Sequence, residues 1–304
     1  MYTYKAYGLS IESPLEIPEF LVSYTTSPSV FFQFGKIPPP DVRESEMMRV
    51  ILPFEEGILL YWREIGTFLV KKGREVTIDP KPEVDESLLR LVLTGPVLGV
   101  LLHQRGFHVF HSSVISEAHS RDAVAFVALK GGGKSTMASA MYNHGYRLMS
   151  DDIMAISESN GKTVVQPGFP HTKLWGESVE ALVDDAQSLR ELAPDADKRG
   201  RCVKEGFETQ PTPLKILFVL EFGDEIQIRP ISGKEALQSI LPHWYGALFN
   251  GELLDLFGRK EHFLQCVNIV KSVPMYTLSR PKSFQVLPDV VNRVDNFIVN
   301  DFVT

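Results

Sequence analysis

The chain has 304 residues, of which 44% are hydrophobic and 23% charged, and its formal net charge at pH 7 is −7. These values are typical of a globular protein with one large domain or two smaller ones. The negative charge argues against a surface devoted to nucleic acid, so we expect no nucleic-acid partner. Cys202 and Cys266 lie far apart without the paired spacing of metal ligands. Together with a first segment that lacks the order of a secretory signal, they indicate a cytoplasmic protein with reduced thiols.

Residues 1–84 are predicted to form a β-rich N-terminal part. Short apolar runs alternate there with turn residues, at positions 30–34, 49–54, 58–62, 67–70 and 76–78. Such close spacing is typical of antiparallel hairpins. We therefore divide the chain into this part and an α/β domain over residues 85–304.

The most hydrophobic stretch, residues 88–102, lies in a predicted helix that begins near Asp85 and ends near Gln104. Gly95 and Pro96 should kink this helix or split it in two. The apolar stretch is short for a bilayer and carries Arg90. We interpret it as a buried core helix and expect no membrane partner.

A glycine-rich loop follows the next predicted strand, residues 123–127. It reads Lys130-Gly131-Gly132-Gly133-Lys134-Ser135-Thr136 and leads into a helix that stops at Gly145. This order suits a phosphate-binding loop, because glycines let backbone N–H groups point inward and the helix N-terminus adds the positive end of its dipole. The pattern G-x-x-x-x-G-K-[ST] holds, except that Ala128 replaces its first glycine.

We predict that this loop binds a nucleoside triphosphate, with Lys134 on the phosphates and Ser135 as a ligand of Mg²⁺. Lys130 either adds charge near the phosphates or is simply solvated. The alternative for the whole loop is a glycine-rich turn without a ligand.

An acidic pair, Asp151-Asp152, ends the following predicted strand, residues 146–150. Consecutive side chains of an extended segment point to opposite sides, so one carboxylate could face Mg²⁺ and the other an incoming hydroxyl. Repulsion between them would raise the pKa of one, which suits a general base. A solvated turn or a helix cap is the alternative.

His111 lies on a strand predicted to run beside the strand of the loop, where it could reach the phosphates or orient a carboxylate. A histidine packed in the core is the alternative. The segment 177–200 is charged and predicted to be mostly helical, with a surface loop near residues 194–201. Lys173, Arg199 and Arg201 are candidates for binding phosphate or a peptide carboxylate, unless they are only solvated. Trp175 is interpreted as a core residue, although an exposed aromatic there could bind a peptide.

Three segments together resemble the HPr serine kinase/phosphorylase family: His111-Ser112-Ser113, the loop at 130–136, and Gly145-Tyr146-Arg147-Leu148-Met149-Ser150-Asp151-Asp152. The resemblance implies the α/β fold of that family's P-loop catalytic domain, which is related to phosphoenolpyruvate carboxykinases. It also implies ATP and Mg²⁺ as cofactors. Carried over residue by residue, Gly131 to Thr136 would bind the triphosphate with Lys134, and Ser135 would hold the metal. Asp151 would deprotonate the acceptor serine, Asp152 would assist with Mg²⁺, and His111 would lie beside the loop.

A looser similarity, which includes residues 4–9, 170–175 and 273–278, resembles the HPr-kinase-like proteins of lasso peptide biosynthesis. Those proteins phosphorylate the C-terminal serine of a precursor peptide. We therefore predict an ATP- and Mg²⁺-dependent serine kinase acting on such a peptide, with Lys173, Arg199 or Arg201 contacting its carboxylate. The alternatives are an HPr-type carrier-protein kinase/phosphorylase and a non-catalytic, nucleotide-dependent peptide-binding module. A homo-oligomer is also open, because metabolic members of the family assemble.

Overall fold

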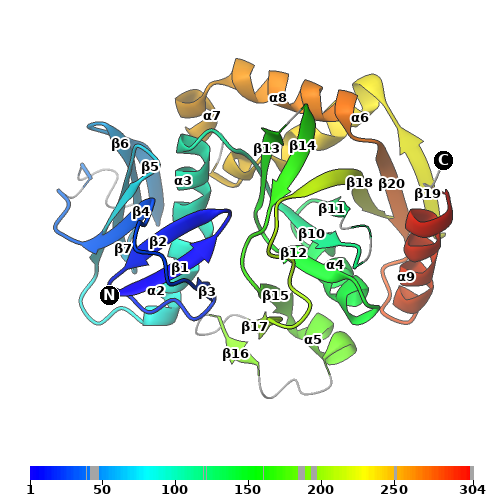
Figure 1. Cartoon of the computed structure of the whole chain (residues 1–304), viewed down its shortest axis with the longest axis horizontal. Coiled ribbons are helices and arrows are strands. Elements are labelled where there is room, and N and C mark those ends of the chain that lie inside the picture. Colours follow the sequence, from blue (N-terminus) through cyan, green and yellow to red (C-terminus); the bar gives the residue numbers. More distant parts are fainter. Residues whose placement is uncertain are drawn as a thin grey trace.

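The computed structural model describes residues 1–38, 40–41, 48–118, 120, 122–159, 161–183, 189–192, 197–249 and 252–301 (Figure 1). Within them the chain forms a mixed α/β structure with two large β-sheets and a small three-stranded one. The α/β class predicted from the sequence is therefore present. Residues 194–196 of the predicted surface loop lie outside the described residues.

The N-terminal sheet contains the first eight strands in the order β3-β1-β2-β4-β8-β7-β6-β5. Their bounds are β1 Tyr2–Ala6, β2 Leu9–Ser13, β3 Leu21–Val22, β4 Val30–Phe34, β5 Arg49–Phe54, β6 Gly57–Trp62, β7 Gly66–Lys71 and β8 Glu75–Pro80. The predicted β-rich character is confirmed, and β5 to β8 form an antiparallel meander. The prediction of hairpins throughout is wrong at β4, which pairs in parallel with β2 and β8. A parallel neighbour needs a longer crossover than a hairpin turn.

The apolar segment after this sheet is one interrupted helix, as predicted. It consists of α2 (Glu86–Val92), a π-helical turn η1 (Leu93–Val97) that contains Pro96, and α3 (Leu98–Gln104). Asp85 caps its start by accepting a hydrogen bond from the backbone N–H of Ser87 at 2.6 Å.

By length and composition Glu86–Gln104 is apolar enough to cross a membrane, and 67% of its most apolar window is buried inside the protein. In Figure 1 α3 stands between the two large sheets. Its buried side chains belong to the same core as those of the N-terminal sheet. Because the helix packs on the sheet that precedes it, the boundary between residues 84 and 85 stays a prediction.

The second sheet has the strand order β12-β10-β11-β18-β14-β13-β9, with β20 beside β18 and β19 beside β20. The bounds are β9 His108–Phe110, β10 Ser112–Ser116, β11 Ala123–Val127, β12 Arg147–Ser150, β13 Met154–Ser159, β14 Lys162–Gln166, β18 Thr212–Phe222, β19 Gln227–Ile231 and β20 Met275–Arg280. Strands β11, β18 and β20 run parallel to one another. Their carboxyl ends therefore meet at one edge of the sheet, which is where ligands bind in sheets of this kind.

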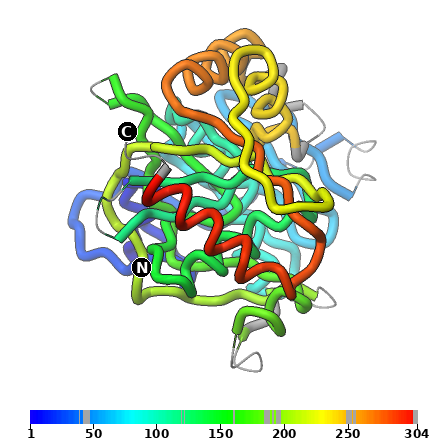
Figure 2. The backbone as a smooth tube through the Cα atoms, turned by 90° about the vertical axis from the view of Figure 1, so that its right-hand side faces the viewer, coloured from blue at the N-terminus to red at the C-terminus, as the bar shows by residue number. Residues whose placement is uncertain are grey.

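Helices cover both faces of this sheet because β11 is apolar on both. Val124 and Phe126 pack with α4 (Lys134–Asn143) and α9 (Leu287–Asn296), whereas Ala125 and Val127 pack on the face of α6 (Gly233–Ile240) and α8 (Arg259–Ser272). In Figure 2 α9 lies in front of the strands, facing the viewer. The remaining helical elements are α5 Gly176–Leu182, η3 Leu241–His243, η4 Tyr245–Phe249, α7 Glu252–Phe257 and η5 Phe297–Asp301.

The small sheet corrects the prediction of a mostly helical segment over residues 177–200. Among the residues of this stretch that the structure describes, only those of α5 are helical, and the part predicted as a surface loop contains the strand β17 (Lys198–Cys202). This strand pairs along its whole length with β15 (His171–Trp175), and β16 (Arg190–Glu191) flanks it. The pairing satisfies the backbone of β17 although its side chains are mainly charged.

Candidate functional site

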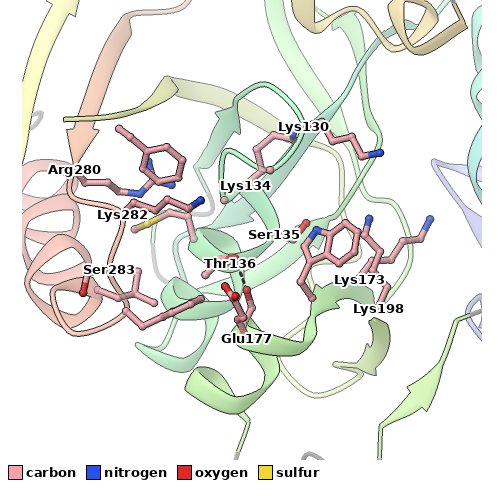
Figure 3. A pocket seen from close by; sticks show the side chains of 18 of the residues that line it. Lys130, Lys134, Ser135, Thr136, Lys173, Glu177, Lys198, Arg280, Lys282 and Ser283 are labelled. Atoms are coloured by element: carbon pink, nitrogen blue, oxygen red, sulfur yellow. Dashed lines mark hydrogen bonds between the residues drawn. The ribbon is translucent and has the colours of Figure 1, made fainter. Parts of the chain in front are cut away.

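A cavity of about 370 Å³ lies where β11 runs into α4 (Figure 3). Every residue of the glycine-rich loop from Lys130 to Thr136 except Gly132 lines it. One end carries His111, Asp152, Lys173, Trp175 and Lys198, and the other carries Phe222, Arg280, Lys282, Phe284 and Leu287. Figure 3 shows Lys173 and Lys198 at one end, Arg280 and Lys282 at the other, and Lys134 between them.

The backbone of the loop requires its glycines. Gly131 and Gly133 both have φ near +82°, a left-handed conformation that side chains disfavour. A Cβ at Gly133 would lie 2.5 Å from Nη2 of Arg280, and one at Gly132 would lie 2.6 Å from the Cβ of Ala128. Ala128 therefore fits where the usual pattern has glycine because position 132 carries no Cβ.

The helix after the loop presents a site for an anion. Its first turn begins at Lys134, and the N–H groups of Lys134, Ser135 and Thr136 precede the first hydrogen bond of the helix, from Met137 to Gly133. The Lys134 side chain is buried, and its ammonium donates to the Ala128 carbonyl at 2.9 Å. Burial lowers the pKa of Lys134 to about 8, although Asp151 and Asp152 act in the opposite direction. A phosphate at this place would restore the favoured charge of the lysine.

Asp151 is buried directly beneath the loop. Its Oδ1 accepts hydrogen bonds from the hydroxyls of Ser135 at 2.8 Å and Ser113 at 2.6 Å, and its Oδ2 accepts from the backbone N–H of Lys173 at 2.8 Å. Both carboxylate oxygens are thus engaged by groups of the protein, and Asp151 does not line the cavity. This arrangement holds Ser135 in place.

Asp152 turns away from Asp151 and lines the cavity instead. Its φ of +75° is a strained, left-handed conformation for a residue other than glycine. One carboxylate oxygen accepts from Nζ of Lys173 at 2.9 Å, and the other lies 3.1 Å from Nδ1 of His111. The same nitrogen lies 3.0 Å from the Asp152 carbonyl oxygen, and because both neighbours are acceptors it carries the proton.

The pKa of Asp152 shifts in the direction opposite to the one predicted from the acidic pair. Burial raises its pKa, but the ion pair with Lys173 and the hydrogen bond from His111 outweigh that effect and hold the pKa well below the usual range. The prediction that repulsion between the two aspartates makes one of them easy to protonate is therefore wrong for Asp152. A third charge, on Lys173, decides the balance.

Two distant elements support the turn at Asp152. Tyr7, at the tip of the β1–β2 hairpin, is buried and donates its hydroxyl hydrogen to the carbonyl of Ile153 at 3.0 Å. A Cβ at Gly95, in the π-helical turn, would lie 3.9 Å from both Oδ2 of Asp152 and Nζ of Lys173. π-Helical turns are frequent at functional sites. The N-terminal sheet and the interrupted helix thus both lie beside the turn at Asp152, although neither Tyr7 nor Gly95 lines the cavity.

The three predicted cations do not share one face. Lys173 reaches the cavity, but Arg199 and Arg201 do not line it. In the β15–β17 ladder Lys198 pairs with Trp175, and alternation turns Arg199 and Arg201 to the opposite face. There Arg201 donates to Asn143 at 3.0 Å and lies over the ring of Tyr142. The two arginines are therefore wrong as candidates for this cavity, and Lys198 takes their place.

The cavity also contains residues that were not predicted from the sequence. Arg280 ends β20 and donates to the Gly132 carbonyl at 2.7 Å, so it fixes the loop from the far side. Its guanidinium lies 5.0 Å from the ring centre of Phe222, the last residue of β18. Both residues could have been found from their positions at the ends of apolar strands. Strands that run parallel to the loop strand in the same sheet end at the same edge as the loop. Trp175, interpreted as a core residue, is 44% exposed and lines the cavity.

Magnesium fits the donor set at the loop. Mg²⁺ prefers oxygen ligands and is usually held by one or two protein groups together with phosphate oxygens and water. Ser135 and Asp152 carry such oxygens in the cavity, and Asp151 holds Ser135 from beneath. Among the described residues no three His, Cys, Asp or Glu side chains form a cluster that could hold a metal by themselves. The metal would therefore bind together with phosphate.

Comparison with known proteins shows a distant structural similarity. No protein-family model matches the sequence, and no curated protein matches it. Among solved structures, the chain is similar to the Hpr(Ser) kinase/phosphatase from Coxiella burnetii, with 9% sequence identity and a TM-score of 0.34. The similarity covers 64% of this chain and 97% of that chain. At this distance the function has to be inferred from the side chains of the cavity.

Proposed function

We propose that this protein is a kinase that transfers the γ-phosphoryl group of MgATP to a serine hydroxyl. The observation that carries the proposal is the combination, in one cavity, of an anion-binding loop with a carboxylate at its end. The loop supplies N–H groups, Lys134 and Ser135, and Asp152 lies in the same cavity. A protein that only binds a nucleotide has no need of that carboxylate.

The two ends of the cavity fit different parts of the reaction. The triphosphate would lie over the loop, and the nucleoside would extend toward Phe222 and Phe284, which are 47% and 39% exposed and offer rings for stacking. The acceptor would enter from the end that carries Asp152, Lys173 and Trp175. The γ-phosphoryl group would then lie between donor and acceptor.

Each side chain of the cavity has a separate role in the proposed phosphoryl transfer. The serine oxygen attacks the γ-phosphorus, the bond from that phosphorus to the ADP oxygen breaks, and the hydroxyl proton passes to Asp152. His111 and Lys173 hold the Asp152 carboxylate ionised and oriented, and its low pKa makes it a weak base that takes the proton as the bond to the ADP oxygen breaks. Lys134 and the N–H groups of the loop neutralise charge on the phosphates. Mg²⁺, held by Ser135 with Asp151 behind it, would supply further positive charge.

These contacts favour an exchange of the two aspartate roles carried over from the family. Asp151 is saturated by protein donors beneath Ser135, which suits support of the metal site. Asp152 faces the cavity and is 24% exposed, which suits contact with the acceptor. We therefore propose Asp152 as the base and Asp151 as the residue that positions Ser135.

We take the acceptor to be a serine in a peptide, and specifically the C-terminal serine of a lasso peptide precursor. This finer assignment rests on the sequence resemblance described above. The exposed Trp175 at the acceptor end is compatible with a peptide.

Mass spectrometry tests the proposal. A precursor peptide ending in serine, incubated with the protein and MgATP, should gain the mass of one phosphate on that serine. The Lys134→Met variant should give none, because it lacks the ammonium at the phosphates. Phosphate on an HPr-like carrier protein and not on the peptide would favour the carrier-protein alternative. Binding of MgATP without transfer to either would contradict the kinase proposal.

A further inference from the structure

The acceptor end of the cavity holds a positive charge that phosphate transfer does not require. Six cationic side chains line the cavity: Lys130, Lys134, Lys173, Lys198, Arg280 and Lys282. The lining carboxylates are Asp152 and Glu177, with Asp151 just beneath Ser135. A triphosphate with its magnesium ion brings about two negative charges, so the cavity stays positive after it binds.

Most of these cations already have partners or a place on the loop. Lys173 pairs with Asp152 at 2.9 Å, Arg280 donates to the Gly132 carbonyl at 2.7 Å, and Lys134 lies at the phosphate position. Lys198 is different. Among the described residues no carboxylate pairs with it, and its ammonium lies over the ring of Trp175, 4.7 Å from the ring centre.

The position of Lys198 is defined by the β15–β17 ladder. It pairs with Trp175, two residues from Lys173 along β15, so all three side chains lie on the same face. Figure 3 shows Lys173 and Lys198 extending in the same direction at this end of the cavity. Burial and the nearby Lys173 and Lys130 lower the pKa of Lys198, although Asp152 and Asp151 act against this shift. A half-buried ammonium without a carboxylate partner costs free energy that a bound anion would offset.

We propose that Lys198 and Trp175 form a subsite for a carboxylate that the acceptor carries next to its reactive hydroxyl. The proposal rests on the kinase function above and goes beyond it, because it assigns recognition of the acceptor's charge to two residues. A C-terminal serine carries such a carboxylate one carbon away from its side chain. Lys198 would bind this group while Lys173 stays with Asp152, and the indole would cover the end of the peptide.

The test uses two synthetic peptides that end in serine and differ only in a free C-terminal acid or a C-terminal amide. The kcat/KM of phosphorylation by MgATP is measured for each. With the unmodified protein, amidation should lower kcat/KM roughly 10- to 100-fold, mainly through KM, because a charge-assisted contact is lost. Lys198→Met should phosphorylate both peptides equally, and Lys198→Arg should keep the preference for the acid.

Arg199→Met is the matched control. It removes a cation one residue further along β17, on the face that points away from the cavity, and should leave the acid-to-amide ratio unchanged. A ratio near one in the unmodified protein would overturn the subsite, whatever the variants do. So would a Lys198→Met variant that keeps the ratio but binds MgATP more weakly, because Lys198 would then serve the triphosphate. If neither peptide is phosphorylated, the kinase proposal itself fails, and the subsite fails with it.

Discussion

Replacing Asp152 by asparagine keeps the shape of the side chain and removes its charge. This change distinguishes the proposed role of Asp152 from that of Asp151 most clearly. In the protein the Asp152 carboxylate accepts from Lys173 at 2.9 Å and lies 3.1 Å from Nδ1 of His111, at the acceptor end of the cavity. An amide cannot take the proton of a serine hydroxyl. Loss of a positioned base typically costs 10²- to 10⁴-fold, so we expect kcat to fall by about that factor. The KM for MgATP should change little, because the loop and Lys134 hold the phosphates.

The matched variant Asp151→Asn should behave differently. Its carboxylate holds Ser135 at 2.8 Å, so the loss should weaken magnesium binding by roughly 10- to 100-fold, and excess Mg²⁺ should restore much of the rate. The assay is steady-state phosphorylation of a serine peptide at increasing Mg²⁺ for both variants. The division of roles is refuted if Asp152→Asn keeps kcat within about tenfold while Asp151→Asn loses it without rescue by Mg²⁺. Urea unfolding of both variants separates loss of activity from loss of folded protein.

Three further predictions concern the loop and its support. Because burial lowers the pKa of Lys134 to about 8, binding of MgATP at about pH 9 should take up a proton, and the affinity for MgATP should fall as the pH rises. Calorimetry in buffers of different ionisation enthalpy measures this proton uptake. The interpretation fails if the Lys134→Met variant takes up as many protons. Gly133→Ala adds a Cβ 2.5 Å from Arg280 at a φ of +82°, so binding of a fluorescent ATP analogue should weaken at least tenfold while the fold remains; unchanged affinity would contradict the loop geometry. Tyr7→Phe leaves the buried carbonyl of Ile153 without its hydrogen-bond donor at 3.0 Å. The change should lower the free energy of unfolding by about 1–3 kcal/mol and also reduce kcat. An unchanged kcat per folded molecule would show that Tyr7 does not position the site.

The glycine-rich loop and the interrupted helix could be predicted because local rules determine both. Glycines at 131 and 133 are required by a left-handed backbone, and the lysine and serine that follow open the helix. Gly95 and Pro96 likewise interrupt the helix within its own sequence. In each case the physical cause lies within a few residues of the effect.

The face of a strand could not be predicted in the same way. Arg199 and Lys198 are neighbours, and which of them faces the cavity depends on the register of β17 against β15. A slip of one residue would exchange them, and nothing within β17 itself fixes that register. The predicted helix and loop over this segment left no strand to which alternation could be applied.

Residues brought together from distant segments were also beyond the sequence pattern. Arg280 reaches Gly132 only because β20, β18 and β11 run parallel and end at the same edge. The pKa of Asp152 depends in the same way on Lys173, which β15 supplies from outside the acidic pair. Repulsion between Asp151 and Asp152 alone would raise a pKa, which is opposite to the shift found for Asp152.

The measurement that tests the central claim most directly is a crystal structure with a non-hydrolysable ATP analogue, Mg²⁺ and a peptide ending in serine. We expect the phosphates to bind the N–H groups of the loop and the adenine ring to lie between Phe222 and Phe284. The serine hydroxyl should donate a hydrogen bond to Asp152. A nucleotide bound in the reverse direction, with its base against Trp175 and Lys198, would contradict the account, because Asp152 would then face no acceptor.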